Sequence, residues 1–171
     1  MEKLFYSSFS SSLGRICLAS TKKGICWLTV DVGKKMNNLK EYLASRYQRI
    51  AVPAGDRRKD AATQLEAYLR GRLTKIKLPV DFIEGSDFQR LVWEETSKVP
   101  FGQVVTYKEI AIRIGRAKAF RAVGQALAAN PVAIIVPCHR VISSNGSLGG
   151  YGLGLELKRD LLKLEGVLNS V

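Results

Sequence analysis

The sequence is poor in the residues that bind metal ions or build disulfide frameworks. Its 171 residues include one histidine and three cysteines. Three cysteines do not make a disulfide framework, and a single histidine leaves few candidates for a Cys/His zinc site. We therefore expect no metal and no other cofactor. Cys17 and Cys26 fall on adjacent predicted strands, and we expect them to be buried and reduced, with a structural disulfide as the alternative.

Long apolar runs are also missing from the sequence. No stretch approaches the roughly 20 apolar residues that a membrane span needs. The first residues, MEKLFYSSFSSS, lack the basic and then apolar layout of a signal peptide. We expect a cytoplasmic protein without a membrane partner.

Acidic residues are scarce relative to basic ones. The chain has 15 Asp and Glu against 27 Lys and Arg, for a net charge of +12. Such an excess favours a polyanionic partner, most simply nucleic acid, and a generally basic, solvated surface is the alternative. Residues 1–85 hold 16 basic and 8 acidic side chains, and residues 86–171 hold 11 and 7, so most of the excess lies in the N-terminal half.

The N-terminal half predicts a small α/β domain. GRICLAST (14–21) and ICWLTVDV (25–32) flank a glycine turn and predict a hairpin. NNLKEYLASRY (37–47) and DAATQLEAYLRG (60–71) predict helices, the second with Gly71 as its C-cap. The extended stretch 73–85 contains Pro79 and Gly85 and predicts a boundary. We expect an α/β domain at 1–80, with helices on a small antiparallel sheet, and a second domain at 81–171.

The C-terminal half predicts a mainly α-helical domain. Ser86 is a candidate N-cap for a helix that stops before Pro100, and Thr106 with Glu109 forms a candidate capping box. Gly115 ends that second helix, and AFRAVGQALAAN (119–130) predicts a third. Two short helices joined by a tight, basic turn indicate a helix-turn-helix, although such helix pairs also occur in ordinary α domains.

The stretch NPVAIIVPCHRV (130–141) carries the candidate chemistry. It predicts a continuous apolar strand that delivers Cys138 to the floor of a pocket. A thiol needs a base or a positive neighbour to react at neutral pH, and His139 and Arg140 are the candidates. Adjacent strand residues point to opposite faces, so contact between Cys138 and His139 requires a turn or an intervening water. The alternative is a buried cysteine followed by a polar pair at a strand end.

Five motifs taken together resemble one known family. TYKEIA, RAVGQALAANPV, IVPCHRVI, GGYGLG and LKLEG occur in this order within residues 106–166, and the array closely resembles the O6-alkylguanine-DNA alkyltransferases, or methylated-DNA-protein-cysteine methyltransferases. The resemblance implies that Cys138 takes an alkyl group from O6 of guanine, or less efficiently from O4 of thymine, once and irreversibly. It further implies that His139 is a water-linked base, that Glu165 orients it, and that Asn130 belongs to the same network.

The resemblance also implies how DNA would be bound. Tyr107 would press on the 3′ phosphate while the base rotates out and then donate a hydrogen bond to the guanine, and Arg121 would fill the vacancy in the duplex. The second helix of the helix-turn-helix, at 119–130, would enter the minor groove of double-stranded DNA largely without regard to sequence, with contributions from Lys118, Ala122 and Gly124, and the protein would bind as a monomer. Small residues there allow close approach to a groove, although they would equally allow tight helix packing.

The expected base pocket includes the Val141 backbone, Tyr151, Gly152 and Leu153. Gly152 stands where some relatives have serine, and Leu153 predicts a tighter pocket that accepts methyl more readily than benzyl groups. Two alternatives to alkyl transfer are a catalytically silent lesion-binding sensor of the same fold and a turnover cysteine hydrolase. The presence of Cys138 argues against the sensor, and the sequence gives no independent sign of the oxyanion hole that a hydrolase needs.

Overall fold

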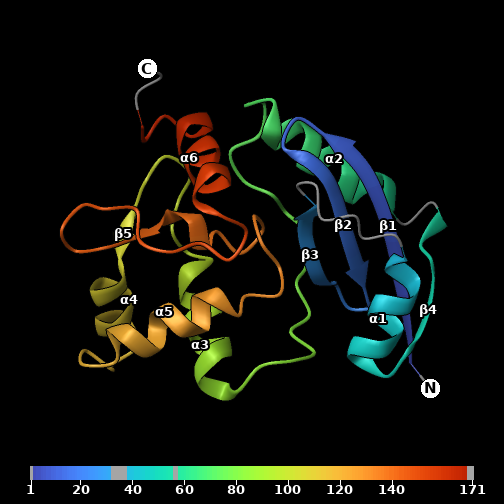
Figure 1. Ribbon diagram of the computed structural model, residues 1–171, viewed down its shortest axis with the longest axis horizontal. Coiled ribbons are helices and arrows are strands. Elements are labelled where there is room, and N and C mark those ends of the chain that lie inside the picture. The colour runs from blue at the N-terminus through green and yellow to red at the C-terminus, as the bar shows by residue number, and fades with distance from the viewer. Residues whose placement is uncertain (1, 32–37, 56–57, 169–171) are drawn as a thin grey trace. The chain divides into compact units, whose positions relative to one another are not determined.

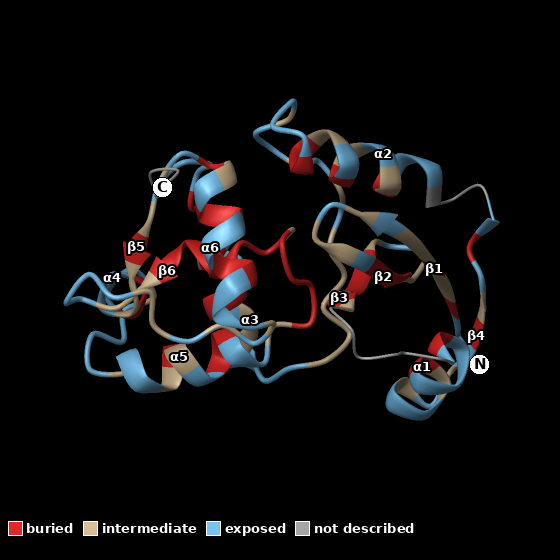
Figure 2. Cartoon of the chain, turned by 45° about the horizontal axis from the view of Figure 1, so that its top comes forward, coloured by how far each residue is buried: buried red, intermediate tan, exposed pale blue. Residues whose placement is uncertain are grey.

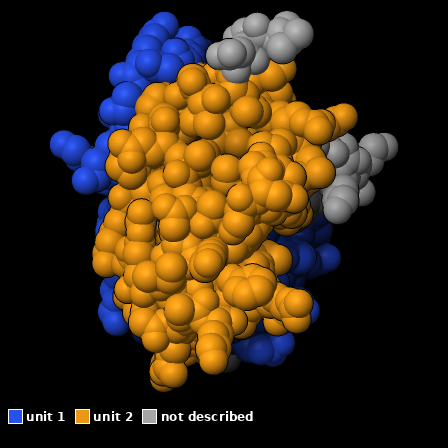
Figure 3. Space-filling view, turned by 90° about the vertical axis from the view of Figure 1, so that its left-hand side faces the viewer, with its two compact units in different colours: residues 1–83 blue, residues 84–171 orange. Residues whose placement is uncertain are grey.

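The computed structural model describes residues 2–31, 38–55 and 58–168. The chain divides into two compact units, residues 1–83 and 84–171, which Figure 3 distinguishes by colour. None of the described helices is long and apolar enough to cross a membrane.

Unit 1 is built on a four-stranded sheet in the order β3-β2-β1-β4. Its strands are β1 (Lys3–Ser11), β2 (Gly14–Ser20), β3 (Ile25–Asp31) and β4 (Ile50–Pro53). The predicted hairpin is confirmed, because β2 and β3 pair antiparallel; Val32 of the predicted strand lies outside the described residues. The sheet is mixed rather than wholly antiparallel, because the chain returns through a helix and β4 pairs parallel to β1.

Two helices pack on this sheet, as predicted. They are α1 (Leu39–Tyr47) and α2 (Arg58–Leu69), and the sheet lies between them in Figures 1 and 2. Asn37 of the first predicted helix lies outside the described residues. Gly71 follows α2 with a φ of +68°, as a left-handed C-cap requires. Cys17 and Cys26 are buried in the core beneath α1, and neither forms a disulfide.

Unit 2 is mainly helical. It contains α3 (Asp87–Thr96), α4 (Tyr107–Arg113), α5 (Phe120–Ala128) and α6 (Leu155–Leu164), together with a two-stranded parallel sheet of β5 (Val105–Thr106) and β6 (Val141–Ile142). The Ser86 cap and the Thr106–Glu109 capping box are both confirmed. Trp93 of α3 donates from its indole Nε1 to the carbonyl of Ala126 at 2.7 Å, which anchors α5.

The prediction of a continuous apolar strand that leads to Cys138 is wrong. Ile134 has a φ of +71°, a left-handed conformation that breaks any extended run. The chain then turns, and Cys138–Arg140 forms one turn of 3₁₀ helix. The residues from Val132 to Val136 are almost all buried, so the apolar run correctly indicated burial. Burial alone does not distinguish a strand from a buried turn.

Candidate active site

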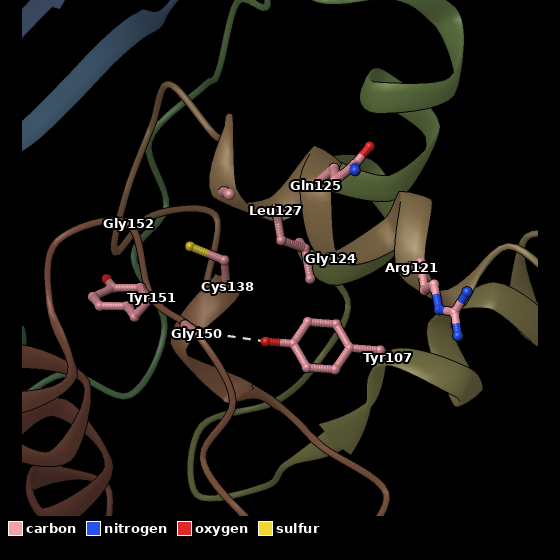
Figure 4. Close-up of a pocket in the computed structure, with 10 residues that line it drawn as sticks. Tyr107, Arg121, Gly124, Gln125, Leu127, Cys138, Gly150, Tyr151 and Gly152 are labelled. Atoms are coloured by element: carbon pink, nitrogen blue, oxygen red, sulfur yellow. Dashed lines mark hydrogen bonds between the residues drawn. The ribbon is translucent and has the colours of Figure 1, made fainter.

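Cys138 lies on the wall of a cavity of about 480 Å³ in unit 2. Only 8% of the Cys138 surface is exposed. Figure 4 shows its side chain among the pocket residues, with Tyr107 and Gly124 between it and Arg121 at the far edge. The lining comes from α4, α5, the 3₁₀ turn and the loop before α6, and consists of Tyr107, Arg121, Gly124, Gln125, Leu127, Ala128, Cys138, Gly150, Tyr151 and Gly152.

The Cys138 thiol is held protonated in the resting protein. Burial raises its pKa, and a hydrogen bond from Asn130 and the nearby Lys158 charge oppose the rise. Asn130 donates from Nδ2 to the Cys138 sulfur and to the carbonyl of Val136, each at 3.1 Å, and accepts from the backbone of Val132. This side chain therefore both positions the sulfur and stabilises negative charge that develops on it.

The His139 side chain is fully buried, and its ring contacts a carboxylate. Its Nε2 lies 2.8 Å from Oε1 of Glu165. Burial lowers the pKa of His139, although Glu165 opposes this shift. The ring is therefore neutral at rest, and a proton on Nε2 that is donated to Glu165 leaves the lone pair on Nδ1. A base needs this tautomer, because it accepts a proton at Nδ1, on the side of the ring turned away from Glu165.

Arg140 does not serve as the positive neighbour of the thiol. Its Nε lies 2.9 and 3.1 Å from the two carboxylate oxygens of Glu165, and its Nη2 lies 2.8 Å from Oε1. Its Nη1 donates to the carbonyl of Val99 at 2.6 Å. The carboxylate also accepts from the backbone of Gly102 at 3.2 Å. Arg140 thus balances the buried charge of Glu165, and the 3₁₀ turn that carries it is fixed to the loop after α3.

Lys158 is the positive neighbour, and the sequence reasoning missed it. The residue has no exposed surface, and its ammonium donates to the carbonyls of Val141, Leu148 and Gly150. Burial lowers its pKa to about 8, and negative charge on the Cys138 sulfur acts in the opposite direction when the thiol loses its proton. One signal was available: Lys158 shares the apolar face of its helix with Leu161 and Leu162, where an exposed lysine is not expected.

Tyr107 packs into the pocket beside the loop that Lys158 holds. Its hydroxyl lies 3.4 Å from the carbonyl of Gly150, a long contact that leaves the proton available to another acceptor. Burial raises the pKa of the hydroxyl, so it stays a donor at neutral pH. Gly149 has a φ of +67°, and a Cβ there would lie 2.7 Å from the Tyr107 oxygen. Because glycine has no Cβ, residue 149 leaves room for the Tyr107 ring and hydroxyl.

The remaining predicted residues divide into two groups. Tyr151 and Gly152 line the pocket, whereas Leu153 is not among the lining residues. Val141 is also not among them, and its carbonyl already accepts from Lys158 at 2.7 Å. The geometry therefore gives no support to a pocket narrowed by Leu153, and that effect stays a prediction.

The residues predicted to face DNA lie on or next to α5. Arg121 and Lys118 are exposed, and Ala122 is half-buried. Gly124 faces the Tyr107 ring, which would lie 3.8 Å from a Cβ at this position. In the part of the chain that the structure describes, no group of three or more His, Cys, Asp or Glu side chains could hold a metal ion.

Comparisons with known proteins agree across both units. Residues 4–82 match the family described as 6-O-methylguanine DNA methyltransferase, ribonuclease-like domain, and residues 87–167 match 6-O-methylguanine DNA methyltransferase, DNA binding domain. The methylated-DNA–protein-cysteine methyltransferase of Methanosarcina barkeri is 44% identical over 167 residues, covering 95% of this chain and 97% of that protein.

Solved structures give the same assignment. The crystal structure of the O6-methylguanine methyltransferase of Mycobacterium tuberculosis has a TM-score of 0.79 at 38% identity, and it covers 95% of this chain and 92% of that one. A structure of the M. tuberculosis protein in complex with DNA gives a TM-score of 0.79 at 37% identity over the same shares. The chain therefore belongs to the family of methylated-DNA–protein-cysteine methyltransferases.

Proposed function

We propose that this protein repairs alkylated DNA by moving the alkyl group from O6 of guanine to Cys138 in one irreversible step. The observation that carries the proposal is the buried thiol on the pocket wall, held by Asn130 and followed by the His139–Glu165 pair. O4 of thymine is a second, poorer substrate.

The transfer breaks one bond and forms one. The Cys138 sulfur attacks the alkyl carbon, the carbon–O6 bond breaks, and its electron pair stays on the guanine. The thiol proton passes through a water molecule to Nδ1 of His139, which Glu165 stabilises in its charged form. Tyr107 donates a hydrogen bond to the base as negative charge develops on it. The thioether product is stable, so each molecule acts once.

A base stacked inside a duplex is inaccessible to a thiol on a pocket wall, so the damaged nucleotide has to leave the stack. Arg121, which is exposed at the edge of the pocket, fills the space that the extruded base leaves in the duplex. The small residues Ala122 and Gly124 let α5 enter the minor groove, and Lys118 contacts phosphate. Binding is then largely independent of sequence and sensitive to salt. We further propose that the protein is a cytoplasmic monomer whose domain at 1–80 supports the DNA-binding domain at 81–171.

Intact-mass measurement tests the proposal. The protein is incubated with a duplex that contains O6-methylguanine, and each molecule is expected to gain one methyl group. Cys138→Ser should gain none, and Cys17→Ala, which removes another buried thiol, should gain it as the wild type does. A lesion-binding sensor would gain nothing and a hydrolase would turn over without a lasting gain. Either result, or a gain that persists in Cys138→Ser, would refute the acceptor assignment.

A further inference from the structure

Unit 1 contains a cavity of about 920 Å³ that the proposed alkyl transfer does not use. Its walls come from the beginning of β1, the turn between β2 and β3, the residue before β4, and the chain that follows Val80. All of these segments belong to residues 1–83, the half of the chain that holds most of the excess positive charge.

Cations dominate the rim of this cavity. Lys3, Lys22, Lys23 and Arg49 line it, against two carboxylates. One carboxylate, Glu2, is paired with Arg49 at 2.9 Å, and the other accepts a hydrogen bond from Thr21. Within residues 2–31, 38–55 and 58–168, no carboxylate forms an ion pair with any of the three lysines. The four cations of the lining exceed its two carboxylates by two charges, and this excess around one hollow favours an anionic ligand.

Arg49 supplies a second, independent indication. Its Nη2 is the atom that pairs with Glu2. Its Nη1 is buried, and no residue that the structure describes accepts a hydrogen bond from it. A buried charged donor without an acceptor is unfavourable. A phosphate oxygen is the kind of acceptor that a guanidinium binds well.

The floor of the cavity is apolar. Lys3 and Phe5 point to the same face of β1 because they are two residues apart, and Val52 is the partner of Phe5 on β4. Leu4 points to the opposite face, into the core under α1. Phe5 and Val52 are only half-buried, so this face offers apolar surface beneath the cations.

We propose that this cavity binds a single-stranded segment of nucleic acid, with its phosphates on the lysines and Arg49 and a base or sugar over Phe5. A duplex keeps its bases stacked inside and presents phosphates on a convex surface, which would leave the apolar floor uncovered. A single strand exposes base faces that can cover it, and cationic grooves with aromatic floors are the usual design for this ligand. The site is separate in chemistry and sequence from the pocket at Cys138.

Salt-dependent binding of a fluorescent oligothymidylate to the full chain tests the proposal. The Lys22→Gln/Lys23→Gln variant is compared with Lys40→Gln/Lys75→Gln, which removes the same charge from exposed positions of unit 1 outside the cavity. Loss of two phosphate contacts should reduce the slope of log K against log salt by about 1.4 in the cavity variant alone. Equal slopes in the two variants would overturn the proposal.

A second arm assigns the site to a unit. Arg121→Ala should weaken oligothymidylate binding less than the Lys22→Gln/Lys23→Gln variant does, and the latter variant should keep wild-type methyl transfer from a short duplex. If Arg121→Ala weakens strand binding and the cavity variant does not, the strand binds in unit 2 and the proposal is wrong. A wild-type protein that accepts no methyl group would overturn the proposed function without affecting this binding measurement, so the two failures are distinguishable.

Discussion

Glu165→Gln removes one charge from the buried network behind Cys138 while keeping nearly the same shape. The wild-type carboxylate receives three contacts from Arg140 at 2.8 to 3.1 Å, one from His139 at 2.8 Å and one from the backbone of Gly102. Glutamine offers one acceptor oxygen and turns an NH₂ group toward donors. Arg140, 8% exposed, would then remain as a buried cation without its counter-charge.

The cost can be estimated from this geometry. Removing one partner of a buried ion pair costs about 3–5 kcal/mol, and at about 2–4 °C per kcal/mol in a chain of this size the melting temperature should fall on the order of 10 °C. The methyl-transfer rate should fall about a hundredfold, because His139 loses the group that stabilises its protonated form.

Thermal unfolding and single-turnover kinetics measure the two effects. Glu156→Gln is the matched control, since Glu156 is an exposed acid in the first turn of α6, the helix whose C-cap is Glu165, and it should change stability by less than about 0.5 kcal/mol. A Glu165→Gln protein as stable and as fast as this control would refute the view that the carboxylate compensates Arg140 and assists His139.

Three further predictions concern the pocket. Gly149→Ala should slow methyl transfer by displacing Tyr107, whereas Gly146→Ala, also at positive φ but facing open space, should cost only backbone strain; equal rates in single-turnover assays would contradict this. Because burial lowers the pKa of His139, the rate should persist as pH falls through the ordinary histidine range and drop only below it; a midpoint near about 6.5 would count against a buried base. If Leu153 narrows the base pocket, as the sequence predicts, Leu153→Gly should speed inactivation by free O6-benzylguanine; an unchanged rate would count against the narrowed pocket and agree with the absence of Leu153 from the pocket lining.

Local signals in the sequence predicted much of the fold. The Ser86 cap, the Thr106–Glu109 capping box and the glycine at 115 each satisfy backbone groups within a few residues of themselves. Their effect does not depend on distant parts of the chain, so a single sequence reveals them. The start of α3 and both ends of α4 follow from these positions.

Features that depend on distant contacts were not predictable in the same way. The run before Cys138 indicated a strand, yet Ile134 adopts a left-handed turn that only its surroundings can enforce. Lys158 finds its three carbonyl partners on segments brought together by folding. Glu165 entered the predicted site through family resemblance, because its distance from His139 in sequence hides their contact.

The burial of Lys158 has a practical consequence. An amine-reactive reagent can reach its ammonium only when the segment around Leu148 and Gly150 opens, whereas Lys163 on the same helix is exposed and reacts freely. The ratio of the two labelling rates therefore measures the free energy of local opening at the pocket wall. Labelling of Lys158 thus reports how often the segment around Leu148 and Gly150 opens.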